Sequence, residues 1–134
     1  MYLREGARRG PTWRETLLMH AVSRIALHPL IPNIQVSWVK VGPQGAAACL
    51  AAGANDMGGT LMNESISRAA GNEHGEELPP EAMHALIESA GRTPMQRNTL
   101  YGPADSERRS RSLNAAALAP IVLTPPHREK AAAA

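Results

Sequence analysis

The chain has 134 residues, of which 43% are hydrophobic and only 3% aromatic, so its composition is globular and at most one ordinary domain fits. The 14 Lys and Arg residues nearly balance the 12 Asp and Glu residues, which does not suggest the concentrated basic face of a nucleic-acid-binding protein. No apolar run reaches the roughly 18 residues of a membrane span, and the basic N-terminus lacks the apolar stretch of a signal peptide. We therefore expect a cytoplasmic protein that binds neither nucleic acid nor membrane.

The first predicted element is a helix from residue 12 to about residue 28. Thr12 and Glu15 have the spacing of a capping box, apolar residues follow at i, i+4 and i+7, and Pro29 ends the pattern. His20 and His28 border this helix on roughly one face. Neither has a convincing third ligand nearby, so no metal site is predicted there.

A strand is predicted for residues 33–41, which are rich in β-branched and aromatic side chains. Gln35 and Ser37 would share one face of it, where they either hydrogen-bond neighbouring backbone or line a ligand pocket. A helix is predicted for 43–52, with Pro near its first turn and Gly just past its end, and a second strand for 54–57. Strand, helix and strand then form a βαβ unit with parallel strands.

The loop Gly58-Gly59-Thr60 follows the second strand. Loops at the carboxyl ends of parallel strands are where α/β folds bind ligands, and a glycine pair before a helix offers backbone N–H groups to an anion. Asn63 is the expected cap of a helix through residue 70. A stand-alone nucleotide-binding module would depend on this loop alone, which lacks the spacing of a P-loop or a dinucleotide fingerprint.

The second half of the chain has one clear helix, predicted for 80–91 from its apolar periodicity. An acidic loop at 72–78 precedes it, and an extended, basic-polar segment at 92–101 follows. From residue 102 to 134, Pro, Ser, Arg and Ala dominate, which predicts a disordered tail. The domain division is therefore 1–101 and 102–134. Cys49, the only cysteine, is expected to be a small buried hydrophobe.

Four motifs occur together and in order: NIQVSWVK at 33–40, GANDMGGTLMNE at 53–64, ISRAAG at 66–71, and GRTP with QRNTLY at 91–101. Together they resemble the C-terminal part of FO synthase, a radical-SAM family that makes the 5-deazaflavin chromophore of a redox coenzyme. The resemblance covers about residues 1–105. It is greatest to the end of the second module of the large bifunctional form.

The resemblance implies an α/β fold: the C-terminal portion of a radical-SAM TIM-type (β/α)8 barrel. Residues 33–41 and 54–57 would be its last two parallel strands, with flanking helices. A complete barrel takes about 250 residues, so residues 1–101 would form an incomplete barrel with an open edge of unpaired backbone groups. We expect the isolated chain to be marginally stable or aggregation-prone.

The resemblance also implies chemistry. The complete family enzyme cleaves S-adenosylmethionine at a [4Fe-4S] cluster and joins a tyrosine-derived 4-hydroxybenzyl group to 5-amino-6-ribitylaminouracil. The cluster motif, CxxxCxxC, is absent from this chain, where Cys49 stands alone. The chain would therefore supply only the substrate side of the pocket, with no metal ligand of its own.

Two alternatives stay open. The first is a fragment of an aminofutalosine or cyclic-futalosine synthase of menaquinone biosynthesis, since these enzymes share the Gly-Ala-Asn-Asp core. The second is not an enzyme by itself: an inactive gene fragment, or a half-barrel that complements a partner chain carrying the cluster.

Barrel active sites lie at the carboxyl ends of the strands. The substrate-binding candidates on that geometry are Gln35, Ser37, Trp38, Asn55, Asp56, Gly58, Gly59 and Thr60. Asp56 ranks first, as a carboxylate for the ammonium of tyrosine or for ribityl hydroxyls. Asn55 and Gln35 are candidates for reading the uracil edge, and the glycine loop for receiving a carboxylate. No catalytic residue is predicted.

Overall fold

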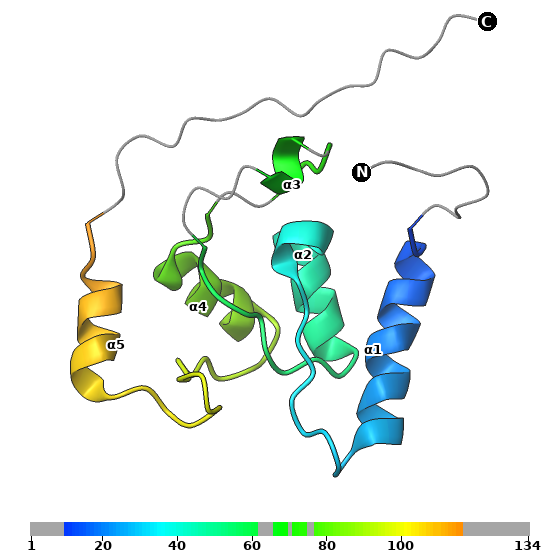
Figure 1. Ribbon diagram of the computed structural model, residues 1–134, viewed down its shortest axis with the longest axis horizontal. Helices are drawn as coiled ribbons and strands as arrows, with labels where there is room; N and C mark the ends of the chain where they lie inside the picture. Colours follow the sequence, from blue (N-terminus) through cyan, green and yellow to red (C-terminus); the bar gives the residue numbers. More distant parts are fainter. Residues whose placement is uncertain (1–9, 62–65, 70, 75–76, 117–134) are drawn as a thin grey trace, which may run out of the picture.

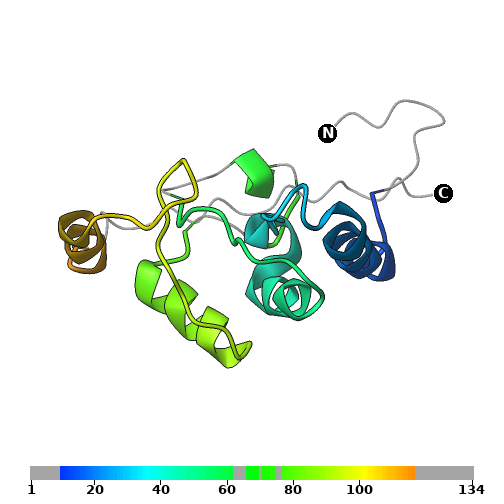
Figure 2. The same cartoon turned by 90° about the horizontal axis from the view of Figure 1, so that it is seen from below.

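The computed structural model describes residues 10–61, 66–69, 71–74 and 77–116, which form a small helical domain. Its helices are α1 (Trp13–Leu27), α2 (Trp38–Ala51), α3 (Ile66–Ala69), α4 (Pro80–Ser89) and α5 (Ser106–Leu113). Helices α1, α2, α4 and α5 lie in a row in which each contacts the next (Figure 1). The extended segments that connect them lie along one side of this row (Figure 2).

Helix α1 confirms the predicted capping box. The backbone N–H of Glu15 donates to Thr12 Oγ1 at 3.3 Å, and the Glu15 carboxylate accepts from the Thr12 backbone N–H at 2.8 Å. The helix ends at Leu27, ahead of Pro29. No residue of α1 is buried. The helix is held in place by its contacts with α2 and by the hydrogen bonds of Arg24, near its C-terminal end.

The strand predicted for 33–41 is wrong from Trp38 onward. Residues 33–37 are extended, but α2 begins at Trp38, and the N–H groups of Lys40 and Val41 donate to the Ser37 carbonyl. Gly42, with φ 73°, breaks α2 into two parts, and its second part matches the helix predicted to begin at Pro43. Tertiary contacts overrode β propensity here, because the Trp38 indole N–H donates to the Gly59 carbonyl at 2.9 Å.

The parallel pairing of the two extended segments is confirmed. The Val36 N–H donates to the Asp56 carbonyl at 2.8 Å, and the Asn55 N–H donates to the Ile34 carbonyl at 3.0 Å. Within the described residues this pairing amounts to an isolated parallel bridge between Gln35 and Asp56 rather than to two strands. The order of extended segment, helix and extended segment is therefore right, while the predicted strand lengths are not.

The core lies between α2, α4 and the paired segments. It consists of Val36, Trp38, Val39, Ala46, Cys49, Leu50, Ala54, Met57 and Met83. Cys49 is fully buried, and this burial raises the pKa of its thiol. The prediction of a small buried hydrophobe is therefore confirmed.

The C-terminal half mostly follows the predicted elements. Helix α4 is confirmed: it ends at Ser89, and Gly91, which has φ 70°, follows its C-cap Ala90. Helix α3 falls inside the helix expected up to residue 70, whose predicted cap Asn63 lies outside the described residues. In the predicted tail, α5 differs from the expected disorder: the Asp105 side chain accepts from the Arg108 N–H at 2.7 Å and caps it. Residues 117–134 are outside the description.

None of the helices in the described part of the chain is long and apolar enough to cross a membrane.

Candidate functional site

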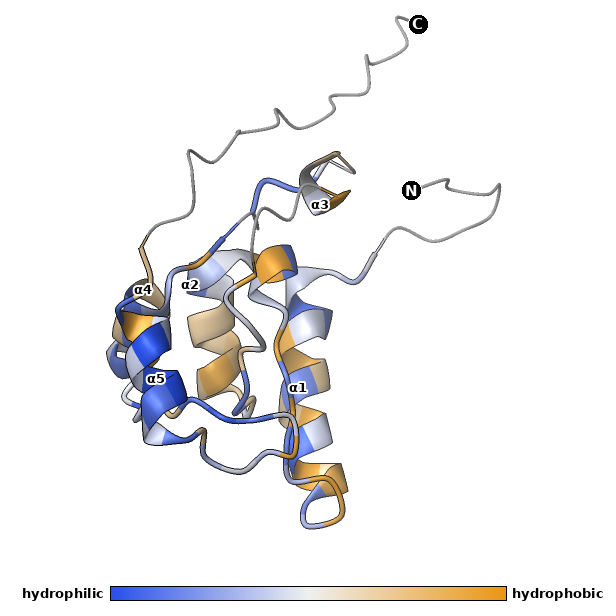
Figure 3. Cartoon of the chain, turned by 60° about the vertical axis from the view of Figure 1, so that its left-hand side comes forward, coloured by the Kyte–Doolittle hydropathy of each residue, from blue (hydrophilic) through white to orange (hydrophobic). Residues whose placement is uncertain are grey.

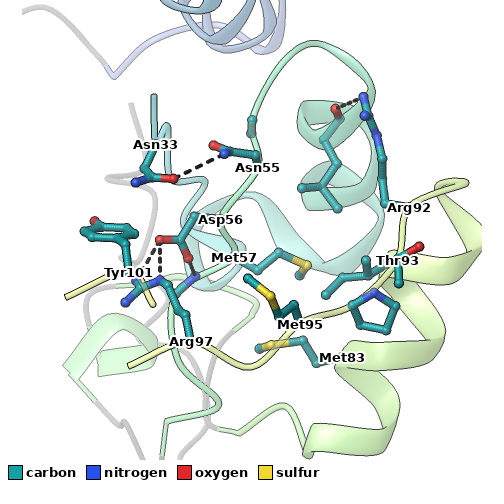
Figure 4. A pocket seen from close by; sticks show the side chains of 15 residues that line it. Asn33, Asn55, Asp56, Met57, Met83, Arg92, Thr93, Met95, Arg97 and Tyr101 are labelled. Carbon is teal, nitrogen blue, oxygen red and sulfur yellow. Dashed lines mark hydrogen bonds and ion pairs between the residues drawn. The ribbon is translucent and has the colours of Figure 1, made fainter. Parts of the chain in front are cut away.

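Asp56 is the one buried charged residue among the described residues, and it ends the second extended segment. Its Oδ1 accepts from the Gly58 backbone N–H at 2.8 Å. Its Oδ2 accepts from Arg97 Nε at 2.8 Å and lies 2.6 Å from Arg97 Nη2 (Figure 4). The carboxylate therefore sits in an ion pair in which the arginine presents two N–H groups to one oxygen.

Arg97 is presented by a tight turn between α4 and α5. An antiparallel bridge joins Arg97 to Pro103, and the Asn98 N–H donates to the Gly102 carbonyl at 2.8 Å. The Asn98 side-chain oxygen accepts from two backbone N–H groups inside the turn. Tyr101, in the left-handed region with φ 63°, places its ring 4.3 Å from the guanidinium carbon of Arg97, within the range of a cation–π contact.

A cavity of about 320 Å³ opens beside this ion pair. Its apolar lining includes Leu50, Ala54, Ile87 and the methionines Met57, Met83 and Met95, whose side chains converge in Figure 4. An adjoining cavity of about 200 Å³ shares Gly58, Met83, Met95 and Arg97 with it. A pocket with an apolar lining and a few polar groups at one end is the usual form of a small-molecule site.

The structure brings some predicted site residues to these cavities and leaves others out. Asn55, Asp56 and Gly58 line the larger cavity, and Gly58, Gly59 and Thr60 line the smaller one. Gln35, Ser37 and Trp38 line neither.

The Asn55 side chain makes four hydrogen bonds within the fold. Its Oδ1 accepts from Arg24 Nη2 and from the Ile34 N–H, each at 2.8 Å. Its Nδ2 donates to the Pro32 carbonyl at 3.2 Å and to Asn33 Oδ1 at 3.3 Å. Two lone pairs and two hydrogens are the whole capacity of an amide, so Asn55 is saturated.

The three residues outside the cavities differ in role. Trp38 is buried in the core and donates its indole N–H to Gly59. Ser37 occupies the N-cap position of α2 without a side-chain cap bond and is exposed. Gln35 is exposed, and its side chain lies against Gly58. A Cβ atom on residue 58 would lie only 2.7 Å from Gln35 Nε2. Gly58 also has φ 76°, so this close approach requires glycine.

Sequence reasoning missed Arg97, Tyr101 and the methionine lining. Arg97 and Tyr101 both lie in the QRNTLY motif. The sequence therefore marked this segment, but it did not show that Arg97 contacts Asp56. Arg97 is 41 residues from Asp56, and no local pattern connects residues so far apart. Within the described ranges, no group of three or more His, Cys, Asp or Glu is placed to hold a metal ion.

Comparisons with known proteins place this geometry in context. The family described as the CofH/MqnC C-terminal region matches residues 3–110. A 5-amino-6-(D-ribitylamino)uracil–L-tyrosine 4-hydroxyphenyl transferase of Methanopyrus kandleri is 55% identical over 103 residues, or 77% of this chain and 28% of the relative. An FO synthase of Streptomyces coelicolor is 51% identical over 108 residues, or 81% of this chain and 12% of the relative.

A second archaeal transferase of the same name, from Archaeoglobus fulgidus, is 53% identical over 97 residues, or 72% of this chain and 28% of the relative. The resemblance to FO synthase is thereby confirmed. The chain spans between about an eighth and somewhat over a quarter of the length of these relatives. No solved structure matches it.

Proposed function

The chain belongs to the CofH/MqnC C-terminal region family, and from this premise we propose that it is the C-terminal, substrate-side part of an FO synthase-type enzyme. The activity proposed for the complete protein is the coupling of a tyrosine-derived 4-hydroxybenzyl group to 5-amino-6-ribitylaminouracil. The observation that supports this best is the identity of 51–55% to relatives that carry these names. The proposed location is cytoplasmic.

The proposed fold of the complete protein is a radical-SAM (β/α)8 barrel, of which this chain forms the end. Two observations support the proposal. The segments around Gln35 and Asp56 pair in parallel across α2, as consecutive barrel strands do. Helices α1, α2 and α4 lie side by side with the extended segments along one side of them, as expected for a sector of a barrel (Figure 2).

The [4Fe-4S] cluster implied by the family finds no set of cysteine ligands in this chain. Cys49 is its only cysteine and is a fully buried residue of α2, whereas a [4Fe-4S] cluster is held by several cysteine thiolates. The residues present therefore do not fit the cluster, and no chemical step is assigned to it here. The cluster would be held by the part of the enzyme outside this chain, in the same polypeptide or in a partner chain.

Substrate binding is the role proposed for the residues at the cavities. Asp56 with its partner Arg97 supplies the polar end, and the loop of Gly58, Gly59 and Thr60 supplies backbone groups beside it. Gln35 and Ser37 lie on the exposed side of the paired segments, where they would face the rest of the barrel. Asn55 and Trp38 would not contact the substrate themselves. Their hydrogen bonds hold the extended segments, and thereby the binding residues, in place.

A chimera tests the proposed function. The region of the Methanopyrus kandleri transferase that this chain matches is replaced by residues 3–110, and the purified, reconstituted enzyme receives tyrosine, 5-amino-6-ribitylaminouracil and S-adenosylmethionine. Mass spectrometry is expected to detect the 4-hydroxybenzyl–uracil adduct. A soluble, cluster-loaded chimera that yields no adduct, or that yields a futalosine derivative from menaquinone precursors, would contradict the proposal.

The outer face of α1 exposes apolar side chains, as expected where the rest of a larger fold would cover it. Leu18, Met19, Val22 and Ile25 on α1, together with Leu30 and Ile31 just beyond it, are all at least half exposed. Figure 3 shows hydrophobic residues recurring along α1 and into the loop after it. Contiguous apolar exposure of this kind marks an interaction surface, and the missing part of the enzyme is the occupant we propose.

Ile25→Asp tests this assignment, because Ile25 is 82% exposed in the described structure. In the chimera the substitution is expected to bury an unpaired charge, which destabilises a protein by several kcal/mol, and to reduce the soluble yield severely. In the isolated chain it should leave the helical circular-dichroism signal intact. Leu100→Asp is the control, since Leu100 is 87% exposed at the distant turn. An unaffected Ile25→Asp chimera would show that α1 does not dock there.

A further inference from the structure

The Asp56–Arg97 pair has a countable hydrogen-bonding capacity left for a ligand. An ionised carboxylate has about four acceptor sites, and three are occupied: one by the Gly58 N–H and two by Arg97. An arginine has five N–H donors, and three are occupied: two by Asp56 and one by the Asn98 carbonyl at 3.2 Å. Within the contacts of the described residues, one acceptor of Asp56 and two donors of Arg97 therefore remain.

The charge at the cavity disfavours a cationic ligand. Among the described residues that line either cavity, Asp56 is the only acidic one, and Arg97 neutralises it. Arg92 also lines the larger cavity, so the lining carries a small excess of positive charge. The ammonium of an amino acid needs acceptors for three N–H groups, and the single acceptor left on Asp56 lies beside a guanidinium that repels it.

The apolar part of the cavity suits a flat ring. Met57, Met83 and Met95 line it with thioethers, which pack favourably against ring edges and faces. Leu50 and Ile87 complete this lining. At about 320 Å³ the cavity lies at the lower end of the volumes typical of small-molecule sites, roughly 300–1,000 Å³. It therefore accommodates one small ring system.

We propose that this cavity binds a neutral heterocycle with alternating carbonyl and N–H groups. Of the two substrates in the transferase's name, this describes 5-amino-6-(D-ribitylamino)uracil and not the zwitterionic tyrosine. A ring carbonyl of the ureide accepts from the free N–H groups of Arg97, and a ring N–H donates to Asp56. The choice of uracil rests on the function proposed above, whereas the preference for a neutral ring over an ammonium rests on the charge and the hydrogen-bonding groups at the cavity. Arg97 is then a specificity-determining residue.

Steady-state kinetics of the chimera test the assignment, with each substrate varied in turn. Arg97→Lys keeps a positive charge but loses the planar fork of donors. It is expected to raise the KM for 5-amino-6-ribitylaminouracil about tenfold or more, and Asp56→Asn should act in the same direction. In both variants the KM for tyrosine should stay within about twofold of its original value. The control Arg14→Lys changes an exposed residue and should leave both KM values within the same range. A rise confined to tyrosine, or equal for both substrates, would overturn the proposal.

A binding experiment on the chain itself is independent of turnover. With 13C-labelled methionine methyl groups, adding 6-(D-ribitylamino)uracil is expected to shift the NMR signals of Met57, Met83 and Met95, and adding tyrosine is not. Met19, exposed on α1, is the internal control. Shifts with tyrosine, or with neither compound at millimolar concentration, would overturn the inference. Adduct formed by the chimera without these shifts would refute this inference and leave the proposed function standing.

Discussion

Arg97→Ala is expected to destabilise the chain by about 3 kcal/mol, the lower end of the range for breaking a buried ion pair. The substitution leaves the Asp56 carboxylate, whose side chain is 7% exposed, with only the Gly58 N–H as a partner. The lower end of the range applies because Arg97 itself is 30% exposed, so water reaches the vacated site. Thermal and urea unfolding followed by circular dichroism measure the loss.

Removing the negative charge of Asp56 instead is expected to lower the free energy of unfolding by less. Comparing the two substitutions therefore tests which partner of the ion pair needs the other. Asp56→Asn keeps an acceptor for Gly58 and leaves Arg97 free to hydrate, so about 1 kcal/mol is expected, the scale of one net hydrogen bond. Tyr101→Ala removes only the cation–π contact and serves as the control, with an expected loss of about 0.5–1 kcal/mol. Equal losses for Arg97→Ala and Asp56→Asn would contradict the view that the cost arises from the stranded carboxylate.

Arg24→Ala is expected to cost about 3 kcal/mol as well, because several charge-assisted hydrogen bonds are lost at once. Its guanidinium donates to the Gly53 carbonyl, the Pro32 carbonyl and Asn55 Oδ1, each at 2.8 Å. These bonds fasten the end of α1 to the starts of both paired segments. Native domains are stable by only about 5–15 kcal/mol, so a marginal fragment would lose most of its helical signal at 25 °C.

Two variants make the Arg24 prediction specific. Arg24→Lys keeps the charge but cannot reach three acceptors in different directions, so it should recover little stability. Arg14→Ala changes the same residue type on the exposed part of the same helix and should change stability by less than about 0.5 kcal/mol. If Arg24→Lys were as stable as the original chain, the three hydrogen bonds would not be the source of the effect.

The elements that the sequence predicted well are those with local signals. The capping box at Thr12 and Glu15 predicted the start of α1, and the apolar periodicity with Gly91 predicted α4. The parallel pairing around Gln35 and Asp56 followed from the order of predicted elements. Each of these depends on residues within a few positions of one another, or on a general rule of chain connection.

The elements that the sequence did not predict depend on distant contacts. Trp38 and Val39 have strand propensity, but the indole hydrogen bond to Gly59 and the burial of both side chains in the core favour a helix start there. Arg97 became visible as a site residue only when the fold placed it on Asp56. The four hydrogen bonds of the Asn55 side chain likewise join it to two distant segments, the end of α1 and residues 32–34, which no local pattern predicts.

We propose that this chain is the C-terminal part of a longer FO synthase-type enzyme. Sequencing the genomic DNA upstream of Met1 in the same reading frame tests this proposal. We expect a continuous open frame that encodes the CxxxCxxC cluster motif, which would make the whole enzyme available for the substitutions above. An in-frame stop codon close upstream of Met1 would contradict it.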